Sequence, residues 1–326
     1  MTHSSSPTPM DALRSAFGEA LQENASLAGY TTAHAGGPAE ALLVAGSAKE
    51  LEQYARRLWE MDAPFTVLGY GSNVLVSDCG VQGVVIINRA RAIEIDAESE
   101  PPSVRAESGA LIGTIARQAA LRGLSGFEWA ATVPGTLGGA VYGNAGAFGG
   151  DMHGSLLLAE ILHPGGIEFW PVDRMQYEYR SSLLKRSRIP AIILAARLKF
   201  ERSEPQIVQE KMDAFSNRRR STQPPGASMG SMFKNPAGDY AGRLIEAAGL
   251  KGTRFGDAEI SPLHANFFIN HGGASAKDIG RLISTARETV AKQFGIQLEL
   301  EVELLGDWST VLTDTHHMGE HSDHER

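Results

Sequence analysis

A run of 16 residues, 134–149, limits the folds that this chain can adopt. It reads PGTLGGAVYGNAGAFG and holds six glycines, three alanines, two aromatic residues and no charged side chain. A flexible linker would be more polar and would lack the aromatic rings. Side chains this small let the backbone approach a neighbouring layer or a large flat ligand closely. The segment therefore predicts either tight backbone packing between two layers or one wall of a ligand site.

A second glycine cluster, Gly69-Tyr-Gly-Ser-Asn73, directly follows an apolar run at 65–68 that predicts a strand. Successive exposed N–H groups in such a turn can form an anion-binding nest, although an ordinary β-turn has the same composition. The cluster is not a P-loop, because no Gly-Lys-Ser/Thr follows it, and no periodic helix follows it as in a Rossmann fingerprint. Together the two clusters offer what a dinucleotide requires, a pyrophosphate nest and a wall of small residues.

Composition excludes several classes of protein. The 326 residues are enough for two or three domains, and 42% hydrophobic with 21% charged residues is typical of a soluble globular protein. A net charge of -8 argues against nucleic-acid binding. The chain lacks a signal peptide and any apolar run near the ~20 residues that span a bilayer. The single cysteine, Cys79, fits a reducing compartment. We therefore expect a cytoplasmic protein without a nucleic-acid or membrane partner.

Hydrophobic periodicity predicts a mixed α and β fold. Strands are expected at 41–44, 65–68, 83–87, 190–200 and 296–303, the last with strict alternation of apolar and acidic residues. Helices are expected after a capping box at 47–50, at 111–119, at 241–250, and after a second cap at 275–278 with Gly295 at its end. A polar stretch at 201–210 predicts a domain boundary.

Both ends of the chain are polar. Residues 1–24 are expected to be an extension, and residues 309–326 a disordered tail. The tail holds four of the ten histidines: His316, His317, His321 and His324. They could bind a metal, but nothing apolar stands near them in sequence to fix a geometry, so no metal site is predicted.

Eight segments, taken in chain order, resemble those of the UDP-N-acetylenolpyruvoylglucosamine reductases, the flavoenzymes that make UDP-N-acetylmuramate for the bacterial cell wall. The matching segments are 36–39, 69–78, 134–149, 179–182, 230–236, 244–252, 264–267 and 298–302. Each one is modest alone, but together they span roughly residues 30 to 305 in the family's order.

The resemblance implies an α+β fold. A two-subdomain FAD-binding domain of the vanillyl-alcohol-oxidase type would cover 25–202, with subdomains at 25–90 and 91–202, and a smaller α/β substrate-binding domain would cover 203–308. It further implies FAD and NADPH as cofactors and UDP-N-acetylglucosamine enolpyruvate as substrate. We expect a monomer that serves peptidoglycan synthesis, and through it cell shape and division.

The resemblance also implies catalytic residues. In the family, reduced flavin gives hydride to the enolpyruvyl methylene carbon and a serine protonates the adjacent carbon. The matching positions are Ser231, Arg180 and Glu301, with Glu299 as the next candidate if the alignment within LELEV is displaced by one repeat. The substrate-binding residues implied are Tyr179, Lys234, Asn235, His264 and Asn266. The cofactor-binding residues implied are Gly69, Tyr70, Gly71, Ser72, Asn73, Val74, Pro134, Gly135, Thr136, Gly138, Gly139, Ala140, Asn144, Gly146 and Ala147.

These residue types suit the chemistry. Hydride addition to an enolpyruvyl ether pushes charge into the carboxylate, which a fork-shaped guanidinium can hold at two points. Serine is a weak acid in water, but the enolate carbon is strongly basic, so placement matters more than intrinsic acidity. Without the resemblance, Arg180 could equally be a surface ion-pair partner, and the acidic face with Glu299, Glu301 and Glu303 would be read as solvated.

The spacing 231 − 180 = 51 between Arg180 and Ser231 is similar to that of the shorter family form, which lacks an inserted tyrosine-bearing loop. Two positions depart from the family pattern: His34 replaces a common arginine or lysine, and Leu263 precedes His264 in place of lysine. Two alternatives stay open: another FAD-dependent oxidoreductase, of the alcohol or aldonolactone oxidase type, and a flavin-binding protein without turnover.

Overall fold

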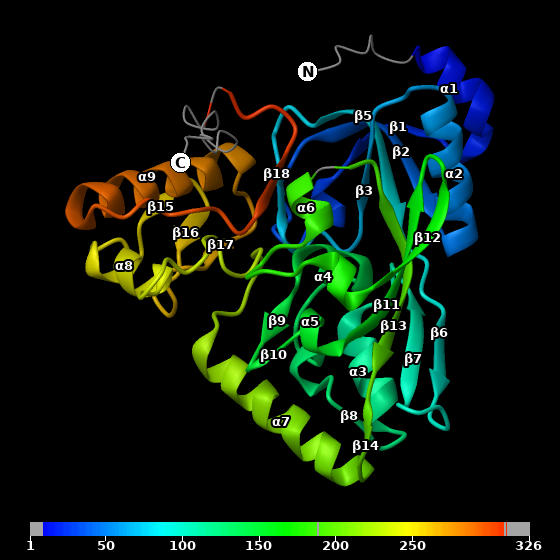
Figure 1. The fold of residues 1–326 in the computed structure, drawn as a ribbon. Coiled ribbons are helices and arrows are strands. Elements are labelled where there is room, and N and C mark those ends of the chain that lie inside the picture. Colours follow the sequence, from blue (N-terminus) through cyan, green and yellow to red (C-terminus); the bar gives the residue numbers. More distant parts are fainter. Residues whose placement is uncertain (1–8, 188, 310, 312–326) are drawn as a thin grey trace, which may run out of the picture. The chain divides into compact units, whose positions relative to one another are not determined.

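The computed structural model describes residues 9–187, 189–309 and 311, which form two compact units (Figure 1). The first unit holds the chain up to residue 25, 39–72 and 82–225, and the second holds 26–38, 73–81 and the chain from 226 onward. Each unit is therefore assembled from separate stretches of sequence. The domain limits expected near 202 remain a prediction, and the histidines of the expected tail lie outside the described residues.

A four-stranded sheet with the order β1-β2-β5-β3 begins the first unit. Its strands are β1 (Gln22–Ser26), β2 (Pro38–Ala45), β5 (Val81–Asn88) and β3 (Phe65–Leu68). The parallel pair β3 and β5 aligns Phe65 with Val84 and Leu68 with Ile87. These strands confirm those expected at 41–44, 65–68 and 83–87.

Helix α2 (Ala48–Glu60) contributes its apolar face to the core of this sheet. Its buried residues are Leu51, Ala55 and Leu58. At its start the Ser47 hydroxyl accepts the Glu50 N–H at 3.2 Å, as the capping pattern predicts. The Glu50 carboxylate accepts the Gly46 N–H at 2.7 Å, so that side chain closes the turn one residue earlier than a regular capping box would. Helix α1 (Met10–Phe17) adds Leu13 to the same core.

A five-stranded antiparallel sheet with the order β12-β11-β13-β7-β6 forms the rest of the unit's framework. Its strands are β6 (Ile93–Asp96), β7 (Ser103–Glu107), β11 (Leu156–His163), β12 (Gly166–Pro171) and β13 (Ile192–Lys199). Helices α3 (Ile112–Ala120), α4 (Leu137–Gly143) and α7 (Pro205–Thr222) share a core with it. That core combines Val104 and Ile161 of the strands with Ile115, Val141 and Met212 of the helices. The strand expected at 190–200 and the helix expected at 111–119 are confirmed.

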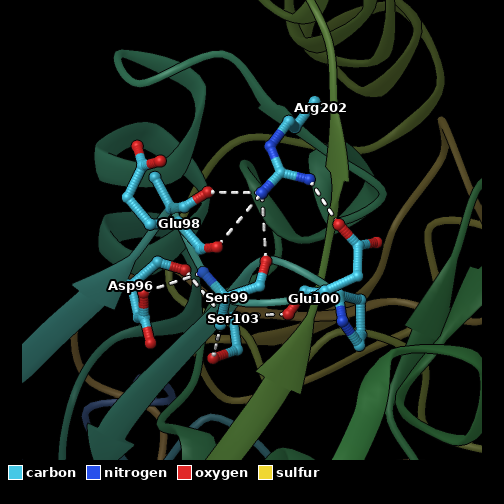
Figure 2. Close-up of polar contacts among 8 residues, drawn as sticks. Asp96, Glu98, Ser99, Glu100, Ser103 and Arg202 are labelled. Atoms are coloured by element: carbon cyan, nitrogen blue, oxygen red, sulfur yellow. Dashed lines mark hydrogen bonds and ion pairs between the residues drawn. The ribbon is translucent and has the colours of Figure 1, made fainter.

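Arg202 stabilises the connection between β6 and β7 through hydrogen bonds of its guanidinium (Figure 2). Its guanidinium donates to the carbonyls of Glu98 and Ser99, at 3.4 and 3.1 Å, and to the Glu100 carboxylate at 2.9 Å. Arg202 lies in β14 (Glu201–Arg202), which pairs with β8 (Leu124–Ser125). The second residue of the polar stretch that predicted a boundary is thus bound to the first unit. Other elements of this unit are η1 (Gly18–Ala20), η3 (Glu128–Ala130), β9 (Gly146–Ala147), β10 (Gly150–Asp151), α5 (Met152–Ser155), η4 (Val172–Met175) and α6 (Leu183–Ser187).

The second unit packs two helices with a small sheet. Its elements are η2 (Ala28–Tyr30), α8 (Ala241–Ala247), α9 (Ala276–Phe294), the sheet β15 (Arg254–Phe255), β16 (Ala258–Ile260) and β17 (Phe268–Asn270), and the parallel pair β4 (Val74–Val76) and β18 (Glu303–Leu305). The core combines Leu244 of α8, Ile260 of β16, and Leu282 and Ile283 of α9. The helices expected at 241–250 and after 275–278 are confirmed.

The start of α9 is capped twice over. Ser275 and Asp278 form the full reciprocal capping box, and Gly295 ends the helix at a φ of 69°, as predicted. In addition, the Asp78 carboxylate accepts the N–H groups of Ala276 and Lys277, both at 2.8 Å. This cap binds the segment 73–81 to the helix and explains why that segment belongs to the second unit.

The alternating segment 296–303 is not a strand over its whole length, so that expectation is wrong. Only Glu303 belongs to β18, and Leu300 forms a single bridge to Phe233. The alternation is seen in burial instead, since Leu298 and Val302 are buried. Alternating burial needs only one apolar surface for the segment to pack against. A β-strand also needs a partner strand of matching length, and the sequence alternation carries no information about such a partner.

We expect Asp78→Ala to lower the free energy of unfolding by about 1–2 kcal/mol, because two N–H groups at the start of α9 lose their acceptor. Chemical denaturation would measure the change. Glu288→Ala removes an exposed carboxylate from the same helix and serves as control, with an expected change within about 0.5 kcal/mol. Equal stability of Asp78→Ala and the unchanged protein would contradict the capping role.

Candidate functional site

The two glycine clusters lie against each other within the first unit. The loop 69–72 follows β3, and the Ser72 hydroxyl donates to the Pro134 carbonyl at 3.1 Å. A β-carbon placed on Gly69 would come within 2.3 Å of the Thr136 hydroxyl oxygen. Two clusters more than sixty residues apart in sequence therefore form one continuous wall, as the pairing of a nest with a small-residue surface requires.

This wall fits an FAD. Gly71 and Gly135 have φ values of 66° and 139°, a region that glycine adopts without strain. The contact at Gly69 leaves no room for a side chain between the two clusters. Backbone N–H groups suit a pyrophosphate, and a surface without bulky side chains suits a flat ring. Tyr70 stands at the edge of the wall with 43% of its surface exposed.

The surface of small residues continues into helix α4 with Gly138, Gly139 and Ala140. At its start the Leu137 and Gly138 N–H groups donate to the carbonyls of Ala110 and Ser108, both at 2.8 Å. A β-carbon on Gly138 would lie 3.0 Å from the Ser108 β-carbon. The first turn is thus held tightly to the end of β7, which fixes the direction of the helix.

Arg180 lies at the other end of α4, in a two-residue turn with Tyr179. Its guanidinium Nη1 donates to the Gly146 carbonyl at 2.9 Å, and its φ is 55°. Asn144, next to the helix end, donates to the Glu178 carbonyl at 3.0 Å. The structure therefore brings the expected cofactor residues Asn144 and Gly146 together with the expected catalytic arginine. Ala147 follows in β9, paired with Gly150, and Tyr179 is 56% exposed.

Ser231 and Glu301 belong to the second unit, on neighbouring segments. Ser231 forms a single antiparallel bridge with Phe267, directly after Gly230 at a φ of 75°. The next residue, Met232, accepts the Glu301 N–H at 2.9 Å. The serine and the glutamate are therefore attached to adjacent, hydrogen-bonded backbone.

Asn73 and Val74, expected at the cofactor, lie in the second unit beside Glu301. The Asn73 amide donates to the Glu301 carbonyl at 3.0 Å, and its own carbonyl accepts the Glu303 N–H at 2.9 Å. Val74 pairs with Glu303 in the parallel ladder. The backbone of Glu301 is thus held at its N–H and at its carbonyl.

Lys234 and Asn235 follow Ser231 in the same segment. The Lys234 ammonium lies 3.2 Å from the carboxylate of Glu299, whose side chain is 63% exposed. The Asn235 side-chain carbonyl accepts the Ala241 N–H at the start of α8, at 3.1 Å. Asn235 therefore has a structural task in addition to any role toward a ligand.

Asn266 holds the segment that carries Ser231, and His264 lies two residues before Asn266 and accepts the Asn266 N–H at its ring Nδ1, at 3.3 Å. Asn266 is 3% exposed, accepts the Phe233 N–H at 2.9 Å and donates to the Phe233 carbonyl at 2.8 Å. Burial lowers the pKa of His264 below its ordinary value, so its imidazole is neutral at neutral pH. A neutral ring offers a hydrogen bond rather than a charge to a ligand.

The sequence analysis missed Asn270, which organises the segment that carries His34. Its amide donates to the Ala33 carbonyl at 2.8 Å and accepts the N–H groups of Gly272 and Ala274 at 2.8 and 3.0 Å. His34 itself has a φ of 51°. A buried asparagine bonded to a distant backbone leaves no periodic signal, so nothing in the pattern pointed to it.

No group of three or more His, Cys, Asp or Glu side chains in 9–187 and 189–309 is placed to hold a metal ion. No helix in that part of the chain is long and apolar enough to cross a membrane.

Two protein families match this chain. The family described as FAD binding domain matches residues 39–166. The family described as UDP-N-acetylenolpyruvoylglucosamine reductase, C-terminal domain, matches residues 222–305. The first match covers the glycine wall, and the second covers the segment with Ser231 and Glu301.

Relatives of known name are similar over nearly the whole chain. A UDP-N-acetylenolpyruvoylglucosamine reductase of Chloroflexus aggregans is 42% identical over 289 residues, covering 87% of this chain and 97% of its own. That of Bacillus subtilis is 40% identical over 285 residues, covering 87% and 93%. The crystal structure of the Thermus caldophilus reductase matches with a TM-score of 0.74 at 35% identity, covering 88% of this chain and 98% of its own.

Adding a methyl group at Gly69 should push the two glycine clusters apart, because its β-carbon would meet Thr136 at 2.3 Å. We expect Gly69→Ala to be purified with much less bound FAD, measured as the ratio of flavin to protein absorbance. Gly165→Ala is the control, since a β-carbon there meets nothing within 4 Å. Full FAD content in Gly69→Ala would contradict the wall as the flavin site.

Proposed function

The chain belongs to the UDP-N-acetylenolpyruvoylglucosamine reductase family, and we propose that it reduces UDP-N-acetylglucosamine enolpyruvate to UDP-N-acetylmuramate with NADPH as reductant. The family consists of FAD-dependent oxidoreductases of peptidoglycan synthesis. Since the proposed substrate is a nucleotide sugar, we place the reaction in the cytoplasm, carried out by a monomer.

The observation that carries this proposal is the fixed backbone around Ser231 and Glu301. Their segments are joined by the bond between Met232 and Glu301, and Asn73 holds the Glu301 carbonyl. A general acid acts efficiently only from a fixed position.

The glycine clusters at 69–72 and 134–140 would hold FAD, which would supply hydride transfer from NADPH to the methylene carbon of the enolpyruvyl group. In the proposed reaction negative charge then develops on the substrate's carboxylate, and the planar guanidinium of Arg180 binds that carboxylate at two points. The Ser231 hydroxyl gives its proton to the adjacent carbon, completing the reduced lactyl ether. We assign the Glu301 carboxyl group to return a proton to the serine oxygen.

The remaining expected residues are proposed to bind the substrate. Lys234 has an ammonium group suited to a diphosphate, which would replace its exposed partner Glu299. Tyr179 offers an exposed ring, and Asn235 and His264 offer polar side chains. Asn266 also holds the backbone of Phe233, two residues after Ser231. The interval between Arg180 and Ser231 is occupied by α6, β13, β14 and α7.

One variant tests the proposed reductase against the two alternatives, an alcohol or aldonolactone oxidase and a flavin-binding protein without turnover. Ser231→Ala should leave flavin reduction by NADPH unchanged and slow reduction of the enolpyruvyl sugar by about two to four orders of magnitude, the usual worth of a general acid. Stopped-flow absorbance measures the two half-reactions separately. Ser228→Ala, three residues earlier, is the control. Equal losses in both half-reactions would contradict the role of Ser231.

Arg180→Lys keeps the positive charge but loses the two-point grip. We expect its kcat/KM for the enolpyruvyl sugar to fall roughly 10- to 100-fold, the worth of one charge-assisted hydrogen bond. Arg174→Lys, an exposed arginine over the Trp170 ring, is the control in steady-state assays. Normal turnover of Arg180→Lys would show that Arg180 does not bind the carboxylate.

A further inference from the structure

The last carbonyls of helix α4 are bonded by side chains from the segment that carries Arg180. The Tyr177 hydroxyl donates to the Val141 carbonyl at 2.8 Å, and the Ser182 hydroxyl donates to the Tyr142 carbonyl at 2.6 Å. Carbonyls in the last turn of a helix have no partner within the helix. The segment 177–182 therefore acts as the C-terminal cap of α4.

Asn144 adds a third bond to the same segment. It follows α4 in the left-handed conformation, at a φ of 47°, and is 7% exposed. Its side-chain N–H donates to the Glu178 carbonyl at 3.0 Å, while its side-chain oxygen accepts the His153 N–H at 3.0 Å. Both halves of the amide are therefore engaged with protein backbone, although the sequence analysis assigned this residue to the cofactor.

These three bonds surround the tight turn that holds Arg180. Glu178 and Ser181 exchange two backbone hydrogen bonds, both at 3.1 Å, and enclose Tyr179 and Arg180. Arg180 has a φ of 55°, a conformation that a residue with a β-carbon adopts only when its surroundings enforce it. Burial also raises the pKa of Tyr177 above its ordinary value, so its hydroxyl stays protonated and able to donate a hydrogen bond.

The turn and the glycine-rich stretch 134–149 each donate a side-chain hydrogen bond to the other. The Asn144 side chain reaches Glu178, and the Arg180 guanidinium reaches back to the Gly146 carbonyl at 2.9 Å. An arginine side chain is long and flexible, and it loses much rotamer freedom when fixed. A turn anchored at its base and at the tip of its arginine allows the guanidinium few orientations.

We propose that Tyr177, Ser182 and Asn144 are positioning residues for Arg180, which fix its turn to the end of α4 and so direct its guanidinium toward the substrate's carboxylate. This inference rests on the proposed function, because it needs Arg180 to bind that carboxylate. Helix α4 then has the flavin wall at its start and the arginine turn at its end. Seven residues of helix set a separation of about 10 Å between the two.

Two isolated changes test the proposal. Tyr177→Phe removes only the hydroxyl, and Asn144→Asp keeps the acceptor for His153 but loses the donor to Glu178. We expect each to lower kcat/KM for the enolpyruvyl sugar about fivefold to tenfold, as the loss of one hydrogen bond does. In Tyr177→Phe, FAD content and flavin reduction by NADPH should stay unchanged. Ser125→Ala, which removes another buried serine bond in the first unit, should leave kcat/KM unchanged.

A double-mutant cycle separates positioning from general structural support. In an Arg180→Ala background, Tyr177→Phe and Asn144→Asp should each change kcat/KM less than twofold, because their effect passes through the arginine. If each variant lowers kcat/KM as much in the Arg180→Ala background as in the unchanged protein, the proposal is overturned. Normal turnover of both single variants would overturn it too. If Arg180→Ala alone turns over normally, the proposed role of Arg180 fails first. If Arg180→Ala is impaired and the single variants are not, only the positioning role fails.

Discussion

The contact between the backbone of Gly69 and the side chain of Thr136 is the constraint on which the first unit depends. At 2.3 Å from a hypothetical β-carbon to the Thr136 hydroxyl oxygen, only glycine fits. Because Ser72 bonds Pro134 at the same place, the turn after β3 and the entry to α4 form one surface. The helix direction then follows from the bonds of Leu137 and Gly138. The arginine turn follows from the helix, since its side chains cap α4.

The second unit uses side-chain amides and a carboxylate, bonded to backbone groups, in place of long sheet ladders. Asp78 caps α9, Asn266 bonds both backbone groups of Phe233, and Asn73 holds the Glu301 carbonyl. A buried amide with both halves bonded stabilises one arrangement and disfavours others, because any shift leaves a polar atom without a partner. Short segments such as 231–234 can therefore keep a fixed geometry without forming a regular strand.

Local patterns predicted the elements well and the polar supports poorly. The capping box at Ser275, the αL glycine at Gly295 and the apolar runs of β3 and β5 depend on residues near in sequence, and each is confirmed. The strand at 296–303 failed because its alternation reports burial and says nothing of a partner strand. The roles of Asn144 and Asn270 depend on backbone groups far along the chain. The resemblance to a family placed Ser231 and Glu301, which periodicity alone would have left as a loop residue and a solvated acid.

The most direct test of the account is anaerobic stopped-flow absorbance of the purified flavoprotein at the flavin band. NADPH is added first and UDP-N-acetylglucosamine enolpyruvate second. The account predicts that the band bleaches with NADPH and returns when the enolpyruvyl sugar is added without oxygen. Return of the band only after oxygen is admitted would contradict the reductase assignment and leave an oxidase or a flavoprotein without this turnover.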